Sequence, residues 1–315
     1  MTTTPQKTRL FISVIFPVYN EQETLLELYD RLIEAISAAD EYDFEFIFVD
    51  DCSKDRTPNI LRELRNRDRR VRIVRFARNC GSHAAISCGL HTCLGDAAVI
   101  LAADLQDPPA LIFDLAKEWE KGAKIVWGVR TARLGEKKTT TFLSRCYYAL
   151  MNWLTSVKMP PTGADVFLAD RVVIESFRKV QEKHTSVFMT LAWLGFEQSS
   201  IDYVKQPRFQ GKSKWSLGKK FKLALDSLLA FSDIPIRYMS VVGFLCATLG
   251  FLYALYVVWC YLHGRPVAGW SSLMVAVLII GGVQMIMLGI LGEYLWRTFD
   301  ESRRRPRYIV EYEIN

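Results

Sequence analysis

Apolar residues follow one pattern through the N-terminal body of this chain. Short runs rich in β-branched residues alternate with longer stretches whose apolar positions recur at helical spacing, which predicts alternating strands and helices. The predicted strands are Phe11–Val18, Phe44–Val49, Val71–Phe76, Ala97–Ala102 and Ile125–Val129, and the predicted helices are Glu21–Ala39, Thr57–Arg67, Ser82–Leu94 and Pro109–Lys121. This order predicts an α/β domain with a mostly parallel sheet and helices on both faces.

Two apolar segments of a different kind follow the body. Residues Ser240–Tyr261 and Ser271–Leu291 contain no charged residue, and each is long enough to cross about 30 Å of hydrocarbon as a helix. Two core helices of a soluble protein are the alternative, but such helices show a polar face and these segments do not. We therefore predict a two-helix transmembrane hairpin over residues 236–296.

Basic residues predict the orientation of the hairpin. Arg265 is the only lysine or arginine in the connector between the spans, whereas several lysines and arginines flank each outer end of the hairpin. The positive-inside rule then places the body and both termini in the cytoplasm, at the cell (inner) membrane. Residues 1–210 form the predicted α/β domain, 211–235 an amphipathic juxtamembrane segment and 297–315 a cytoplasmic tail. The amphipathic pattern of Leu217–Phe231 predicts a helix on the membrane surface, with an ordinary domain helix as the alternative.

Composition narrows the class of protein only a little. The chain has 315 residues, 50% of them hydrophobic, and a net charge of +6, which suits an anionic membrane surface or phosphate groups. Seven cysteines without a CxxC pair favour reduced thiols over disulfides or a zinc site. The polar N-terminus predicts no cleavable signal peptide. Neither GxGxxG nor GxxxxGK[ST] occurs, which disfavours a dinucleotide-binding domain and a P-loop kinase.

Polar side chains follow four of the predicted strands. The clusters are Asn20-Glu21, Asp50-Asp51, Arg78-Asn79 and Asp104 to Asp107. Ligands of parallel α/β sheets bind beyond the carboxyl ends of the strands, so four such clusters predict one site.

The amino-acid sequences of these clusters resemble the motifs of a known family. Pro17-Val18-Tyr19-Asn20-Glu21, Asp50-Asp51 and Asp104-Leu105-Gln106-Asp107-Pro108-Pro109 resemble the inverting family 2 glycosyltransferases. With the hairpin, the chain is most similar to the polyprenyl-phosphate branch, which includes dolichyl-phosphate mannose synthases and bactoprenol glucosyltransferases. This resemblance implies a GT-A fold, a nucleoside-diphosphate sugar donor and a divalent cation, Mg²⁺ or Mn²⁺.

The resemblance also implies a donor site. By resemblance, Pro17, Tyr19, Glu21 and Asp51 line the nucleoside pocket, and Arg78 lies in the donor-side loop. Either Asp50 or Asp51 can accept hydrogen bonds from a base N–H or a ribose hydroxyl. The alternatives are helix capping by Asn20-Glu21, turn chemistry at the aspartate pair and a plain surface role for Arg78.

Asp104 is the first candidate for catalysis and for metal binding. A metal on the diphosphate offsets the charge that develops as the glycosidic bond breaks, and Mg²⁺ or Mn²⁺ prefers oxygen ligands such as Asp104 and Gln106. The family motif usually reads Asp-x-Asp, whereas this chain has Ala102 at the first position. We expect the diphosphate and water to replace the missing carboxylate, and Asp107 lies nearby in sequence.

Asp165 is the second catalytic candidate. The stretch Thr162 to Leu168 resembles the family's Gly-Asp-Phe-Arg-Leu segment and aligns Asp165 with the acidic position often assigned as the base, while Phe167 replaces the arginine. A phosphate acceptor has a second pKa of about 6 and is largely ionised at neutral pH. Asp165 therefore either takes a proton or orients the acceptor or the metal.

A basic loop supplies the predicted acceptor site. The run from Arg208 to Trp215 matches the family's Arg-x-x-Gly-x-Ser-Lys-aromatic loop. Cationic side chains and a flexible glycine suit a phosphate, so Arg208, Ser213 and Lys214 are the predicted contacts to the lipid phosphate. Non-specific attraction to anionic lipids is the alternative.

The predicted activity is sugar transfer to polyprenyl (undecaprenyl) phosphate, with UDP-glucose as the first choice of donor. GDP-mannose and UDP-N-acetylhexosamines stay open as donors. A processive polysaccharide synthase is less favoured, because the chain has only two predicted spans. A non-catalytic membrane scaffold is also less favoured, because Ala102 is the only sequence feature that indicates a lost catalytic site. The expected partners are a nucleotide sugar, polyprenyl phosphate and the lipid bilayer, with no nucleic acid. Nothing in the sequence defines the oligomeric state, so a homo-oligomer stays open.

Overall fold

The chain forms two compact units. The computed structural model describes residues 9–37, 41–133, 157, 160, 164–180, 182, 185–206, 232, 234–264 and 269–315. One unit comprises Met1–Ser227 together with Pro306–Asn315, and the other comprises Leu228–Arg305. The second unit is therefore an insertion, because the chain leaves the first unit and later returns to it.

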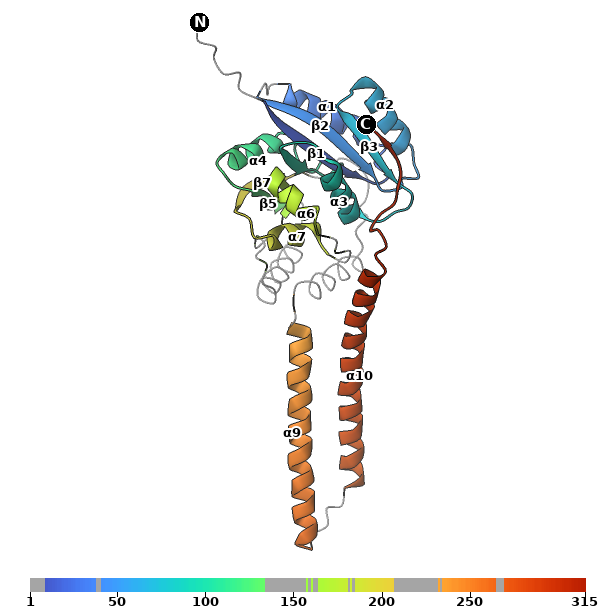
Figure 1. Ribbon diagram of the computed structural model, residues 1–315, viewed down its shortest axis with the longest axis vertical. Coiled ribbons are helices and arrows are strands. Elements are labelled where there is room, and N and C mark those ends of the chain that lie inside the picture. The colour runs from blue at the N-terminus through green and yellow to red at the C-terminus, as the bar shows by residue number, and fades with distance from the viewer. Residues whose placement is uncertain are drawn as a thin grey trace. The chain divides into compact units, whose positions relative to one another are not determined.

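The first unit is built on an eight-stranded sheet with the order β7-β5-β6-β4-β1-β2-β3-β8 (Figure 1). Strands β6 and β8 run antiparallel to their neighbours, whereas the other six point the same way. The carboxyl ends of those six strands consequently meet at one edge of the sheet. The strands are β1 (Leu10–Val18), β2 (Tyr42–Asp50), β3 (Val71–Phe76), β4 (Ala97–Ile100), β5 (Ile125–Arg133), β6 (Ala164–Asp170), β7 (Gln198–Lys205) and β8 (Val310–Ile314).

Helices cover both faces of this sheet. Helices α1 (Leu25–Ile36), α2 (Thr57–Arg67) and α4 (Leu111–Glu120) bury their apolar residues in one core. Helices α3 (Ser82–Thr92) and α6 (Arg171–Phe177) pack on the other face, together with α7 (Val187–Trp193). This three-layer arrangement confirms the α/β fold that the alternating sequence pattern predicted, and it is GT-A-like, as the family resemblance implied.

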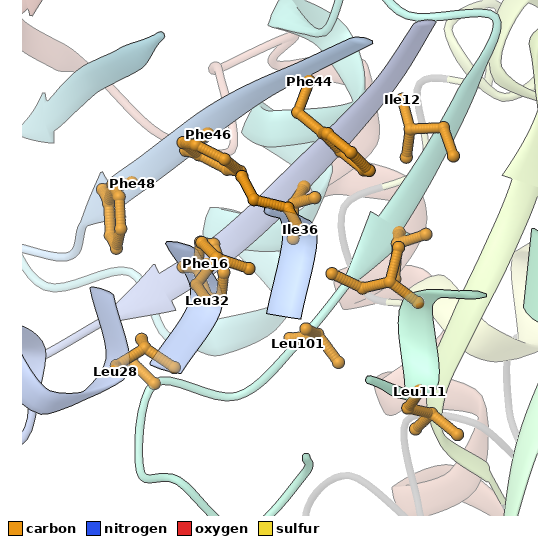
Figure 2. Close-up of a cluster of buried hydrophobic side chains, with 14 of the residues drawn as sticks. Ile12, Phe16, Leu28, Leu32, Ile36, Phe44, Phe46, Phe48, Leu101 and Leu111 are labelled. Atoms are coloured by element: carbon orange, nitrogen blue, oxygen red, sulfur yellow. The ribbon is translucent and has the colours of Figure 1, made fainter. Parts of the chain in front are cut away.

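Alternation along β2 directs one set of aromatic rings into the first core. Phe44, Phe46 and Phe48 point into the cluster that also contains Phe16 and Leu32 (Figure 2). The rings of Phe16 and Phe48 stack with their centroids 4.8 Å apart. Successive strand residues face opposite sides, so a core of this kind sets the register of β2 in the sheet.

On the other face, a glycine allows α3 to lie close to β1. A Cβ atom at Gly89 would stand 2.3 Å from Cγ2 of Ile15, which is well inside van der Waals contact. The absence of a side chain at this position therefore sets the distance between α3 and the sheet.

The predicted elements of the body are confirmed within a few residues at their ends. Five strands and four helices occur where the hydrophobic pattern placed them. Strands β6, β7 and β8 were not predicted, and neither were α6 and α7. Strand β6 lies in the middle of the sheet, between β4 and β5, although its sequence was considered only as a site motif.

The second unit contains two long helices, α9 (Ile234–Leu262) and α10 (Trp270–Ser302). Both are long and apolar enough to cross a membrane, with candidate spans Tyr238–Cys260 and Leu273–Ser302. Their large apolar side chains are exposed, as Phe244 is at 73%. A core helix of a soluble protein would bury such side chains, so these helices fit the predicted hairpin. The predicted surface helix Leu217–Phe231 lies outside the described residues.

Candidate active site

Asp50, at the carboxyl end of β2, is fully buried and ion-paired. Arg75 of β3 lies opposite it in the sheet; its Nη1 donates to Asp50 Oδ2 and its Nη2 to the backbone oxygen of Ser53 at 3.1 Å. The other carboxylate oxygen accepts from the Ser53 backbone N–H at 2.9 Å. Because both oxygens are engaged inside the protein, Asp50 holds the loop after β2 in place.

Asp51 connects that loop to the start of α3. Its two carboxylate oxygens accept from the backbone N–H groups of Cys80, at 2.6 Å, and Gly81, at 2.8 Å. The Asn79 side chain donates to the Asp51 backbone oxygen at 3.2 Å. A carboxylate at a helix N-terminus is favourable, so Asp51 fixes the relative position of two neighbouring strand-end loops.

The loop after β1 is joined to the same network. Asn20 adopts a left-handed backbone conformation (φ 52°), its N–H donates to Ser53 Oγ at 2.9 Å, and its Oδ1 accepts from the Lys54 N–H at 2.8 Å. The Glu21 N–H donates to Thr57 Oγ1 at 2.9 Å. Asparagine tolerates this conformation better than most residues, which explains its place in the motif.

These contacts bring most predicted donor-site residues to one edge of the sheet. Pro17, Tyr19 and Glu21 are partly exposed around the end of β1, and Arg78 is exposed on the loop after β3. Their side chains face solvent at least in part, whereas Asp50 does not. The four strand-end clusters thus lie at one edge, as the sequence pattern predicted.

The loop after β4 carries Asp104 and Gln106, both nearly buried. Asp104 Oδ1 accepts from the Gln106 N–H at 3.3 Å, across Leu105 in a left-handed conformation (φ 60°). Gln106 is held twice by Gln206: its backbone oxygen accepts at 2.9 Å and its side-chain amide donates at 3.3 Å. Gln206 follows β7 directly, so this pair ties the Asp104 loop to the chain just before Arg208.

A charged cluster completes the edge on the β7 side. Lys205 Nζ lies 3.0 Å from Asp165 Oδ2 and 3.4 Å from Asp107 Oδ1. Asp165 also pairs with Arg130 at 3.0 Å, and Asp107 accepts from the hydroxyl of Tyr203 at 2.7 Å. Burial raises the pKa of the Asp107 carboxyl, while Lys205 opposes that shift.

Three members of this cluster were missed from the sequence: Arg130, Tyr203 and Lys205. Tyr203 and Lys205 are two residues apart on β7, so they share one face of the strand. Both side chains are buried. A buried lysine normally has a carboxylate partner, and Lys205 has two, Asp107 and Asp165. Because β7 was not predicted, the alternating spacing of Tyr203 and Lys205 could not be connected to Asp107 and Asp165 from the sequence alone.

The residues of the Asp104 loop fit a divalent cation in their chemistry. Asp104 offers a carboxylate and Gln106 an amide oxygen, and the nearby Asp107 Oδ2 is buried with no hydrogen-bond partner among the described residues. No group of three or more His, Cys, Asp or Glu side chains in the described part of the chain is arranged to hold a metal alone. A cation bound here would need oxygens from a ligand as well.

The predicted acceptor residues Arg208, Ser213 and Lys214 lie outside the described residues. Gln206 is the last described residue before them, and it contacts Gln106. Of the predicted catalytic residues, Asp104 and Asp165 lie at the same edge of the sheet, because β6 runs antiparallel and begins where β4 ends.

Comparison with known proteins gives two matching family models. A model of glycosyl transferase family 2 matches residues 13–206, and a model of the GtrB C-terminal hairpin matches residues 234–297. The first covers the sheet and its site residues, and the second covers α9 and α10.

Individual proteins are similar over almost the whole chain. An uncharacterized glycosyltransferase of Bacillus subtilis, YkcC, is 38% identical over 95% of this chain and 93% of its own length. The bactoprenol glucosyl transferase of Shigella phage SfV is 33% identical over 96% of this chain and 98% of its own length. Among solved structures, the mannosyltransferase PcManGT from Pyrobaculum calidifontis, in complex with GDP-Man and Mn²⁺, is 18% identical, with a TM-score of 0.45 over 83% of this chain and 86% of that chain.

Proposed function

Because the chain belongs to glycosyl transferase family 2 and carries a GtrB-type C-terminal hairpin, we propose that it transfers glucose from UDP-glucose to polyprenyl phosphate. The product is a polyprenyl-monophosphoglucose of the bactoprenol type, formed with inversion at the anomeric carbon. One observation carries the proposal: the similarity to a bactoprenol glucosyl transferase extends over 96% of this chain and 98% of that protein, so it includes both the strand-end site and the hairpin.

The loops after β1, β2 and β3 form the proposed donor side. Tyr19, Glu21 and Arg78 present partly or fully exposed side chains there, and Asp51 joins two of the loops. A nucleotide needs a preformed pocket with a few fixed polar groups, and the hydrogen bonds among these loops supply that rigidity. Asp50 acts from behind the pocket through the loop it holds.

Asp104 and Gln106 are the proposed protein ligands of a Mg²⁺ or Mn²⁺ ion. When bound, the ion supplies positive charge to the leaving diphosphate. Asp104 and Gln106 lie in one loop, and the hydrogen bond from the Gln106 side-chain amide to the Gln206 backbone oxygen orients the Gln106 side chain. Ala102 replaces one carboxylate that the family motif usually has, so a bound ion would need oxygens of the diphosphate as further ligands.

Asp165 is proposed to position the acceptor phosphate. Its carboxylate is already shared between Arg130 and Lys205, and an acceptor phosphate needs little help to lose a proton at neutral pH. Arg208, Ser213 and Lys214 are the proposed contacts to that phosphate. The bond between Gln206 and Gln106 supports a short path from this loop to the donor.

The proposed location is the cytoplasmic face of the cell membrane. Two spans return the chain to the side from which it started, and both ends of the hairpin unit continue into the unit that contains the site. The basic residues on the outer flanks of the hairpin favour the cytoplasmic side for that unit.

Membranes containing the chain, incubated with radiolabelled UDP-glucose, undecaprenyl phosphate and Mn²⁺, test the proposal. We expect a labelled product that partitions into organic solvent and releases glucose on mild acid treatment. GDP-mannose and UDP-N-acetylglucosamine in parallel reactions identify the sugar. Transfer from one of these donors alone corrects the donor, an insoluble polymer indicates a polysaccharide synthase, and no transfer from any donor contradicts the proposed reaction.

A further inference from the structure

Strand β8 forms one edge of the sheet, and in sequence it follows the hairpin unit. It pairs antiparallel with β3 at the edge of the sheet, near the C-terminus marked in Figure 1. Arg75 lies opposite Tyr312, and Phe76 lies opposite Val310. The chain enters β8 from the carboxyl edge, where the Ala77 N–H donates to the Ile309 backbone oxygen at 2.9 Å. This strand therefore starts beside the donor-side loops and runs away from them.

Glu311 of β8 forms an ion pair with Arg75 of β3, next to the site. Its Oε2 accepts from Arg75 Nε at 2.9 Å, and the same guanidinium binds Asp50 and the Ser53 backbone oxygen. One arginine thus joins the C-terminal strand to the loop after β2. Glu311 occupies the Nε side of the guanidinium and leaves its two terminal nitrogens to the loop, which fixes the plane of the group.

The same loop holds the loop after β1. Ser53 Oγ accepts from the Asn20 N–H, and Asn20 Oδ1 accepts from the Lys54 N–H. A chain of hydrogen-bonded groups consequently runs from Glu311 through Arg75 and Ser53 to Asn20. Glu21, next in sequence, belongs to the proposed nucleotide pocket.

We propose that Glu311 is a positioning residue for nucleotide-sugar binding, so that a strand beyond the membrane hairpin completes the donor pocket. It touches no substrate and acts by orienting Arg75, which holds the loop that lines the pocket. This inference rests on the proposed function for the identity of the donor. Loss of Glu311 leaves Arg75 bound to Asp50 but free to tilt, so the pocket loosens without unfolding.

The chain contains a matched control on the same strand. Glu313 Oε1 accepts from Arg72 Nη2 at 3.1 Å, so β8 makes a second ion pair with β3 beside the one between Glu311 and Arg75. Arg72 also binds the buried Glu45 and the Thr92 backbone oxygen, toward the amino ends of the strands and away from the site. Glu313→Ala therefore removes an equivalent ion pair from β8 without touching the loop after β2.

The experiment compares Glu311→Ala and Glu313→Ala in the full chain, purified in lipid nanodiscs. We measure KM and kcat for UDP-glucose and for undecaprenyl phosphate, the Kd of UDP by calorimetry, and Tm. For Glu311→Ala we expect KM for UDP-glucose and Kd for UDP to rise about two- to fivefold, the range of a half-exposed ion pair, with kcat and the lipid KM unchanged. Glu313→Ala leaves all of these constants at wild-type values.

Equal changes in the two variants, or an unchanged Kd for UDP in Glu311→Ala, overturn the inference. If Glu311→Ala does not fold, Glu311→Thr, which is too short to reach Arg75 but favours a β-strand, takes its place with the same expected changes. A wild-type chain that binds UDP but transfers no glucose contradicts the proposed function instead, and the UDP affinities of the variants still decide the role of Glu311.

Discussion

Lys205 Nζ lies 3.0 Å from Asp165 Oδ2, although the two residues are 40 positions apart in the chain. The contact joins the end of β7 to the start of β6 across β5, which lies between these strands. Lys205 is nearly buried, and its second partner, Asp107, has 1% of its surface exposed. A buried cation between two carboxylates lowers the cost of placing those carboxylates together in the site.

Replacing Lys205 by Met is expected to lower transfer by about 100-fold and to reduce the free energy of unfolding by about 3 to 5 kcal/mol, because Asp107 would keep a buried charge without its cation. Steady-state kinetics and thermal unfolding measure the two effects. The matched control is Lys124→Met, which removes the 2.9 Å pair with Asp170 at the other end of β6, where Lys124 is 41% exposed. An equal loss of activity in both variants would show that Lys205 has no special role.

Asp104→Asn is expected to lower transfer by about 100-fold or more while Tm stays close to the wild-type value, because the change removes a charged oxygen ligand but preserves size. Adding Mn²⁺ above the wild-type requirement should restore part of the activity. Asp114→Asn on α4, where the aspartate is 62% exposed, is the control. Full turnover of Asp104→Asn at ordinary Mn²⁺ would rule out the assigned metal ligand.

Because burial of His83, at the start of α3, disfavours its charged form, we expect the protein to lose stability in acid. Burial, and secondarily the charge of Arg307, lowers the pKa of His83 from 6.5 to about 4. The unfolded chain therefore binds the proton first, and stability falls as the pH drops from 6.5 toward 4, by up to about 3 kcal/mol at about 1.4 kcal/mol per unit. Thermal unfolding across this range should show a smaller decline for His83→Asn than for the wild type. Parallel curves for the two proteins would exclude His83 as the source.

Gly89→Ala is expected to destabilise the first unit by about 1 to 3 kcal/mol, since the new methyl group overlaps the Ile15 side chain. Chemical denaturation measures the change. Gly250→Ala in α9, where no atom lies within 4 Å of an added Cβ, is the control and should be close to neutral. If the overlap is the cause, the double variant Gly89→Ala/Ile15→Ala should lose less stability than the sum of the two single variants, whereas additive losses would contradict it.

Much of the fold could be predicted from the sequence because the parallel strands β1 to β4 are rich in apolar and β-branched residues, and each is followed by a segment of helical length. Strand β6 was missed because its apolar run is only a few residues long, and its sequence was considered only as a site motif. Strand β8 alternates charged and apolar residues after a run of arginines, and its partner β3 is far away in sequence. Pairing between such distant segments leaves no local signal.

The site was predicted in part for the same reason. Asp51, Asp104 and the residues of the β1 loop follow predicted strands, so their position at one edge could be deduced from topology alone. The partner of each carboxylate could not be deduced in this way, because Arg75 and Lys205 belong to strands whose side-chain directions depend on the register of the sheet. Asp50 and Asp51 are neighbours in sequence, yet one is held by Arg75 and the other by the start of α3.

The place of β8 in the sheet has a consequence for the biosynthesis of this protein. The ribosome makes β8 after both membrane helices, so β3 remains an open sheet edge while the hairpin inserts into the bilayer. Open edges invite pairing with other chains. A nonsense mutation between α10 and β8 would therefore yield a fully inserted protein that stays exposed to aggregation and to membrane proteases.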